Sequence, residues 1–366
     1  MISTKEKIGT SQMITLLIST ILGVGILSLP RNLADKVQGS GFIIIIISTV
    51  ICIFFGYCMY KVIYGFRNKS LMQISSDILT KPMAYLVCII FILYYLVNIS
   101  MVVRIFGEVV KMYMLEKTPI EVIIISILFV CAYSSKKGIE GIARISQIIL
   151  FLMVVPIIFV FFFSLETADF TNLMPILNVK ASQVFPTVFL TTFAFSGFET
   201  MLVLSIFMRE PKDGFKIQWI TLIVIGIVYI FFSVISIAVF GQVETTHLMW
   251  PTLTIVKVID IPGAFLENLD ALIMGTWTLN IFITLCVFLF CASLVIGDMF
   301  NCREINYFDY AIVPVVYILA MYPDNLAHVY DLLNSKYTVA VQLMVFAGIP
   351  LILFLFSRFS KKVKKA

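Results

Sequence analysis

Two apolar segments of this chain carry glycine where an unbroken membrane helix needs none. Residues 21–30 read ILGVGILSLP, and residues 193–201 read FAFSGFETM. In hydrocarbon every backbone N–H and C=O needs a partner, so a helix is interrupted only where it is buried in protein or lines a polar cavity. Two such breaks, at corresponding positions of two halves, indicate a binding site of the transporter type near the middle of the membrane.

The glycines of these breaks could present backbone groups to a ligand. Unwinding at Gly23 and Gly25 would free carbonyls and amides, and a short helix beginning near Ile26 would direct its partly positive N-terminus at the cavity. A ligand carboxylate could be held there. Gly197 offers the same freedom in the second segment. The alternative is that the glycines only let helices pack closely, as small residues commonly do in membranes.

A carboxylate, Glu199, follows the second break directly. An ionisable side chain deep in a membrane span is costly and by default marks a functional site. Three roles stay open for it: pairing with a ligand ammonium group, carrying a proton, or accepting hydrogen bonds from amides freed at the break. The last of these roles is purely structural.

Polar side chains form two stripes that are expected to face inward. Tyr94 and Asn98 are four residues apart in one predicted span, while Trp277, Asn280 and Thr284 are three and four apart in another. Residues at these spacings share a helix face. We expect both stripes to line the cavity. The alternatives are that Asn and Thr bridge neighbouring helices and that the Trp lies at the membrane interface.

Arg104 and Glu108 lie one turn apart on one helix face, toward the outer end of their span. We expect a structural ion pair within the helix, and the alternative is a gate. The sequence has no phosphate-binding loop, nucleophile elbow or metal-ligand constellation. We therefore expect neither an enzyme nor a cofactor or metal site.

Composition predicts an all-α integral membrane protein. Of the 366 residues, 61% are hydrophobic and 13% are charged, against about 25% charged residues in a soluble domain. A span needs roughly 20 apolar residues. About ten transmembrane helices are predicted, at residues 12–35, 41–65, 83–115, 119–134, 142–165, 183–208, 217–240, 267–297, 310–321 and 337–356.

The spans divide into five plus five around the two breaks. We expect one transmembrane domain over residues 1–366, with a first five-helix repeat at 12–165 and a second at 183–356. The repeats would be inverted, with discontinuous helices 1 and 6. Lys and Arg gather in alternate loops and in a basic tail at 357–366, which predicts that both termini and the tail are cytoplasmic. The net charge of +5 is therefore read as anchoring on anionic lipid, not as a nucleic-acid footprint.

Five stretches together resemble one family over essentially the whole chain. They read SQMITLLISTILGVGILSLPRNL, RIFGEVVKMYMLEKTPIEVIII, FSGFETML, LMWPT and MYPDN. The combination resembles the endospore germination permeases, the B subunits of nutrient germinant receptors in spore-forming bacteria. The glycine pattern with its following proline alone would resemble only the wider amino acid/polyamine/organocation transporter superfamily.

This resemblance implies a broken-helix transporter fold in the spore inner membrane. It also implies an A-type membrane subunit and a C-type lipoprotein as partners, and a small nutrient, most often an amino acid, as ligand. The implied binding residues are Gly23, Val24, Gly25, Ile26, Tyr94, Asn98, Phe195, Ser196, Gly197, Glu199 and Thr284, to which the polar stripe adds Asn280. The resemblance implies that Asn98 and Ser196 vary with the ligand.

Three functions remain open at this point. The first is a sensor, in which the ligand stabilises one arrangement of the two halves and partner subunits read that shift. The second is a proton-coupled amino-acid transporter, with Glu199 carrying the proton. The third is a conduit for water or ions within the receptor complex. The sequence also leaves the coupling ion open, sodium included.

Overall fold

The computed structural model describes residues 6–176, 181–258, 269–302 and 304–358, and regular structure in these ranges is helical apart from one isolated β-bridge. The first half comprises α1 (Thr10–Ile21), α2 (Gly25–Val37), η1 (Gln38–Ser40), α3 (Gly41–Gly65), α4 (Leu71–Ile78), α5 (Lys81–Tyr113), α6 (Ile120–Ser135), α7 (Ile139–Thr167) and η2 (Phe170–Leu173). The second comprises α8 (Ala181–Ala194), α9 (Thr200–Leu204), η3 (Ser205–Phe207), η4 (Pro211–Asp213), α10 (Gly214–His247), α11 (Pro251–Val258), α12 (Leu269–Met299), α13 (Asn306–Met321), α14 (Leu326–Leu333), α15 (Lys336–Leu343), the π-helical η6 (Met344–Gly348) and α16 (Ile349–Ser357).

Each predicted span coincides with one helix or one interrupted helix. Within the described residues, six segments are long and apolar enough to cross a membrane, or seven if the bent pair α13–α14 is counted as one span. The remaining predicted spans fall on shorter helices, because α6 is short and the first and sixth spans are broken. A helix of 16 residues such as α6 reaches only about 24 Å. The prediction of an all-α membrane protein is confirmed.

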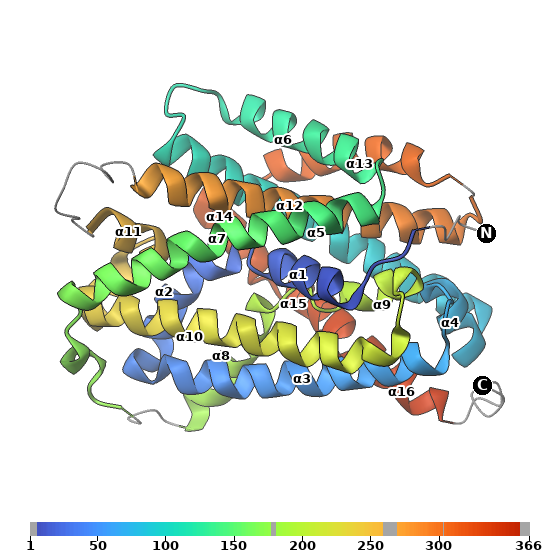
Figure 1. Ribbon diagram of the computed structural model, residues 1–366, viewed down its shortest axis with the longest axis horizontal. Coiled ribbons are helices and arrows are strands. Elements are labelled where there is room, and N and C mark those ends of the chain that lie inside the picture. Colours follow the sequence, from blue (N-terminus) through green and yellow to red (C-terminus); the bar gives the residue numbers. More distant parts are fainter. Residues whose placement is uncertain (1–5, 177–180, 259–268, 303, 359–366) are drawn as a thin grey trace.

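The long helices run side by side along the long axis of the molecule (Figure 1). α12 is the most enclosed of the candidate spans and packs against α5, α7, α6 and α1. α10 packs against α3 and α2 on the other side of α1. This arrangement places α1 of the first interrupted span inside the bundle, where unpaired backbone groups can find partners.

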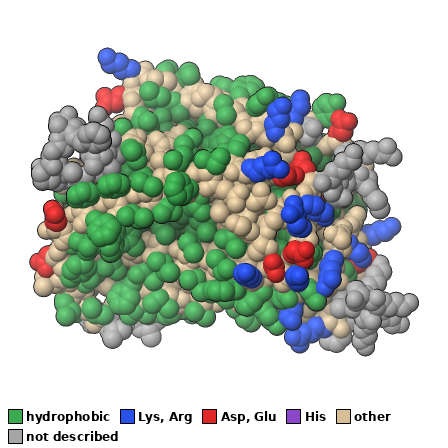
Figure 2. All heavy atoms as spheres, in the orientation of Figure 1, with side chains coloured by type: hydrophobic (Ala, Val, Ile, Leu, Met, Phe, Trp, Pro, Cys, Tyr) green, Lys and Arg blue, Asp and Glu red, His purple; other side chains and the backbone are tan. Residues whose placement is uncertain are grey.

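One end of the molecule carries most of the basic side chains (Figure 2). α4 and the end of α16 lie at this end in Figure 1, and Lys69 precedes α4. The middle of the visible face is largely hydrophobic, as expected of a surface facing lipid. The predicted basic tail lies, from residue 359 onward, outside the described residues. The division into five-helix repeats and the cytoplasmic placement of the termini remain predictions.

The segment preceding α1 is tied to the end of the sixth span. Ile8 and Met208 form a parallel β-bridge, in which the Ile8 amide donates to Phe207 O at 2.8 Å and the Arg209 amide donates to Ile8 O at 2.9 Å. The Thr10 hydroxyl also donates to Asp213 at 2.7 Å. The two broken spans are therefore joined at the basic end as well as at their breaks.

Candidate ligand-binding site

The first break comprises residues 22–24, between α1 and α2, and α12 supplies hydrogen-bond donors to it. Asn280 Nδ2 donates to Ser19 O at 3.1 Å and to Leu22 O at 2.5 Å. Thr284 Oγ1 lies 3.1 Å from Ser19 O, and Trp277 Nε1 donates to Gly23 O at 3.3 Å. The last carbonyls of a helix have no partner within the helix. The stripe on α12 therefore caps α1.

The second break comprises residues 195–199, between α8 and α9, and packs directly on the first. Gly197 has φ of +120°, a conformation that side-chain-bearing residues rarely adopt. A Cβ atom at Gly197 would lie 3.0 Å from Thr20 Cγ2 and 3.1 Å from Ile21 Cγ1. Glycine is required here both for the backbone conformation and for the close approach of α1.

Glu199 lies at the centre of a buried polar network at the second break. Its side chain is 0% exposed. One carboxylate oxygen accepts from the Tyr94 hydroxyl and the other accepts from the Gly197 amide, each at 2.8 Å. The Tyr94 hydroxyl also contacts Ser196 Oγ. Both oxygens of Glu199 are thus engaged, and one of them satisfies an amide that the break frees.

Two side chains of α10 complete the polar contacts of the breaks. The Tyr229 hydroxyl lies 2.7 Å from Ala194 O, at the end of α8, and 3.3 Å from Ile21 O, at the end of α1. Gln218 Nε2 donates to Phe198 O at 3.0 Å. Tyr229 therefore joins the two breaks through one hydroxyl group. The sequence analysis missed both residues, although a Tyr or Gln inside an apolar run is the signal that could have found them.

A cavity of about 600 Å³ extends from the breaks to one end of the molecule. Near the breaks it is lined by Thr20, Gly23, Asn98, Ser196 and Phe288, and toward the surface by Arg31, Asp35, Thr246 and Asn334. Asp35 and Asn334 are exposed. The cavity therefore opens at the end where α2 and α10 finish, which is opposite the basic end.

The residues that we predicted to bind a ligand fall into two groups in the structure. Those lining the cavity are Gly23, Val24, Gly25, Asn98, Ser196 and Thr284. Those not lining it are Ile26, Tyr94, Phe195, Gly197, Glu199 and Asn280, all enclosed around the breaks. Asn98 Nδ2 donates to Tyr94 O within α5, and its side chain reaches the cavity. The second group packs around the breaks without reaching the cavity.

The π-helical segment η6 contacts this second group. Its Phe346 ring lies 6.0 Å from the Tyr94 ring and 5.4 Å from the Phe198 ring, measured between centroids. Single π-helical turns inside α-helices are frequent at functional sites. Gln342, one turn before Phe346, lines the cavity. The last span therefore contributes to both the cavity wall and its support, which the sequence analysis did not anticipate.

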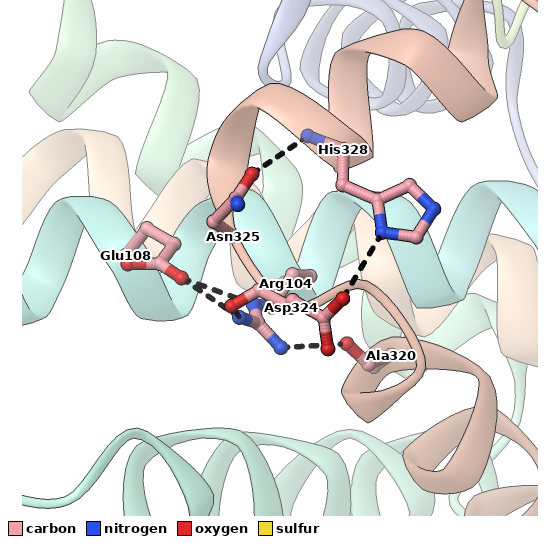
Figure 3. A network of polar contacts seen from close by, with 6 residues as sticks. All are labelled: Arg104, Glu108, Ala320, Asp324, Asn325 and His328. Atoms are coloured by element: carbon pink, nitrogen blue, oxygen red, sulfur yellow. Dashed lines mark hydrogen bonds and ion pairs between the residues drawn. The ribbon is translucent and has the colours of Figure 1, made fainter.

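Arg104 and Glu108 form the predicted ion pair, with Nη2 3.0 Å from Glu108 Oε1. The guanidinium group of Arg104 also reaches the corner between α13 and α14, where it lies 3.2 Å from Ala320 O and 3.5 Å from Asp324 O (Figure 3). These contacts to a distant part of the chain could not be predicted from the spacing of four residues. The ion pair is therefore part of a larger interhelical contact.

A second buried carboxylate, Asp309 of α13, was not singled out from the sequence. It is 0% exposed, and Oδ1 accepts from Ser135 Oγ of α6 at 2.8 Å. Asp309 lies in the first turn of its helix, where the helix dipole favours negative charge. The described residues contain no group of three or more His, Cys, Asp or Glu side chains arranged to hold a metal.

Comparison with known proteins places the chain among spore germination proteins. The model of the spore germination protein family matches residues 7–329. Spore germination protein YndE of Bacillus subtilis is 28% identical over 369 residues, covering 100% of both chains. Spore germination protein B2 of the same organism is 26% identical over 93% of this chain and 94% of its own. GerLB of Bacillus cereus is 28% identical over 88% and 87%.

Solved structures identify the fold. MhsT, in a crystal structure with L-phenylalanine, matches with a TM-score of 0.70 and 10% identity, over 97% of this chain and 99% of its own. A Na⁺-coupled sialic acid symporter, in a substrate-bound outward-open state, matches with a TM-score of 0.70 and 14% identity, over 97% and 80%. With the fold of membrane transporters and a family match over most of its length, the chain belongs to the spore germination protein family of membrane permeases.

Proposed function

We propose that this chain is the B-type subunit of a nutrient germinant receptor and that it binds a small nutrient, an amino acid in the first instance, in the cavity beside the two helix breaks. The observation that carries the proposal is the junction of the breaks at the closed end of the 600 Å³ cavity. Gly23 of the first break, Gly25 at the start of α2 and Ser196 of the second break line the same space. A molecule bound there would contact both interrupted spans at once.

The cavity lining suits a small polar ligand with an apolar portion. Asn98, Ser196 and Thr284 offer polar groups close to the breaks, while Met101, Val102 and Phe288 offer apolar surface. The charged residues of the lining, Arg31, Asp35 and Asp331, belong to α2 and α14. The helix dipole of α2 favours negative charge at its first turn, next to Gly25. A ligand carboxylate would be held at this turn.

Occupancy would act by population shift. A ligand that binds one arrangement of the broken spans more tightly than another moves the equilibrium toward it. Tyr229 joins the ends of α1 and α8, and the Ile8–Met208 bridge joins the segment before α1 to the end of the sixth span, so the two broken spans would move together. In the proposed receptor an A-type membrane subunit and a C-type lipoprotein would read this movement, in the spore inner membrane with the basic end in the cytoplasm.

The alternative function is amino-acid transport coupled to a proton. The transporter fold favours it, and Glu199 would be the proton carrier. In the arrangement described here Glu199 accepts two hydrogen bonds, and the carbonyls of the first break receive donors from Asn280, Thr284 and Trp277. These contacts favour a structural role for Glu199 over that of a proton carrier. We therefore propose a receptor in preference to a transporter.

Uptake and binding measured on the same preparation separate the two functions. The purified chain is reconstituted into proteoliposomes, and uptake of a labelled panel of the twenty amino acids is measured with and without a proton gradient. Thermal-shift binding of the same panel is measured in parallel, and Glu199→Gln serves as the comparison. Binding without uptake is expected for a receptor. Saturable, gradient-dependent uptake that is lost in Glu199→Gln would make the chain a carrier.

A further inference from the structure

α14 forms a wall of the ligand cavity. It follows α13 through a bend of 109° and lines the cavity with Leu326, Ala327, Tyr330, Asp331 and Leu333. α14 has eight residues, and the sharp bend interrupts the helical hydrogen bonds that would otherwise fix its direction relative to α13. Its position must therefore be set by side-chain contacts at its two ends.

Arg104 provides the contact at the bend. Its side chain, only 6% exposed, extends from α5 and places Nη1 3.2 Å from Ala320 O and Nη2 3.5 Å from Asp324 O (Figure 3). Ala320 is in the last turn of α13, where carbonyls lack helical partners and a cation is favoured by the helix dipole. One guanidinium group thus holds carbonyls from both sides of the corner. Glu108 fixes its orientation through Nε at 3.1 Å.

The other contacts of α14 complete the restraint. Asn325 caps its first turn by accepting from the His328 amide at 2.9 Å. Further along, the Tyr330 hydroxyl accepts at 3.1 Å from Nε1 of Trp250, the residue directly before α11. Between these points Val329 is fully buried. α14 is therefore held at its start by Arg104 and near its end by Trp250.

We propose that Arg104 is a positioning residue for the ligand cavity, which clamps the α13–α14 corner and thereby keeps α14 in place as a cavity wall. The ion pair with Glu108 orients the guanidinium group, and the two carbonyl contacts do the clamping. The inference deepens the proposed function, since it concerns the same cavity, but the displacement of α14 can be measured without any ligand.

Thiol reactivity measures how often α14 leaves its place. In a C302S background, V329C puts a thiol at the buried position of α14, and its alkylation by N-ethylmaleimide follows the population in which α14 is displaced. R104Q is expected to raise this rate by roughly tenfold or more for each charge-assisted bond lost. R104K, which cannot reach both carbonyls and Glu108 together, is expected to give a smaller rise.

Three controls separate the clamp from general loosening. R144Q removes an Arg–Glu pair of the same i,i+4 spacing on the surface of α7 and should leave the rate unchanged. E108Q keeps both carbonyl contacts and should change the rate less than R104Q. The native thiols of Cys52 and Cys286 are buried elsewhere and should keep their own rates. The proposal would be overturned if the V329C alkylation rate in R104Q equalled that of the background, or if the rate in E108Q equalled that in R104Q. Faster alkylation of the native thiols in R104Q would also overturn it.

Binding of the twenty amino acids is measured as thermal shift on the same variants. An amino acid that binds the parent should bind R104Q more weakly than R144Q, and equal affinities would refute the link between the clamp and the cavity. If no amino acid binds the parent, the proposed ligand class is wrong, while the alkylation rates still decide whether Arg104 holds α14.

Discussion

Replacing Asn280 by Ala tests whether α12 stabilises the first helix break. Asn280 is fully buried, and its Nδ2 donates to both Ser19 O and Leu22 O. After the substitution Ser19 O keeps a donor in Thr284 at 3.1 Å. Leu22 O loses the donor that Asn280 provides at 2.5 Å. The change therefore leaves one carbonyl of the break without that bond, at a residue that is only 1% exposed.

The expected loss of stability in Asn280→Ala follows from the Leu22 carbonyl, which loses its donor. Leaving one buried polar group without a partner costs about 1–3 kcal/mol, and hydrogen bonds between membrane helices average about 0.6 kcal/mol, so the lower part of this range is expected. If the ligand binds only when the break is ordered, a loss of about 1–3 kcal/mol lowers the apparent affinity by at most roughly 5- to 150-fold, the full factor applying when the disordered break predominates. Both the melting temperature and the affinity should therefore fall.

The assay compares Asn280→Ala with Thr276→Ala in the same helix. Thr276 Oγ1 donates to Ile273 O within α12 and makes no contact with the break, so its removal should change stability by less than about 0.5 kcal/mol. Melting is followed by intrinsic fluorescence in detergent, and binding by titration with the tightest amino acid of the panel. Equal melting and equal affinity in the two variants would refute the reasoning.

Substitutions at three further positions test the other contacts of the breaks, each by thermal melting against the parent chain. Tyr229→Phe removes the donor to the end of α8 and should lower stability by about 1–2 kcal/mol; no change would mean that the breaks are not joined there. Gly197→Ala should lower it by about 1–3 kcal/mol, since φ is +120° and the added methyl group meets α1 at 3.0 Å; a neutral result would contradict the packing of the two breaks. Glu199→Gln keeps an oxygen to accept from the Gly197 amide, so it should lower stability less than Glu199→Ala, which leaves that amide unpaired. The reverse order would show that the fold requires the charge of Glu199 and not its hydrogen bond to the Gly197 amide.

The fold could be predicted largely from hydrophobic run lengths and two glycine patterns. The predicted span at 41–65 has the same bounds as α3, because its run ends abruptly in polar residues on both sides. The interruptions at Gly23 and around Gly197 could be predicted from glycine in two apolar runs, although close helix packing was an alternative reason for those glycines. The bend after Met321 was not predicted, and its contact with Arg104 joins residues more than 200 positions apart in the sequence.

The sequence predicted which residues gather around the breaks, but not which of them line the cavity and which contact other helices. Periodicity placed Asn280 and Thr284 on one face of a helix, but it could not tell whether that face meets a ligand or another helix. The structure has both residues donating to α1, and only Thr284 also lines the cavity. Tyr229 was missed because a single polar atom on an aromatic ring hardly changes an apolar pattern. Whether a residue near a break lines the cavity or contacts another helix depends on packing between distant segments of the chain.

The cavity also determines where an electric field would fall across this protein. When solvent fills it, the cavity from Asp35 down to Ser196 would carry the potential of its own side almost to the breaks. The voltage of the membrane then drops across the closed half, from Glu199 to the basic end. A membrane potential does about 2.3 kcal/mol of work per elementary charge for each 100 mV. A charged nutrient would thus reach the breaks with little electrical work. Any charge moving from Glu199 to the basic end would cross nearly the whole membrane potential.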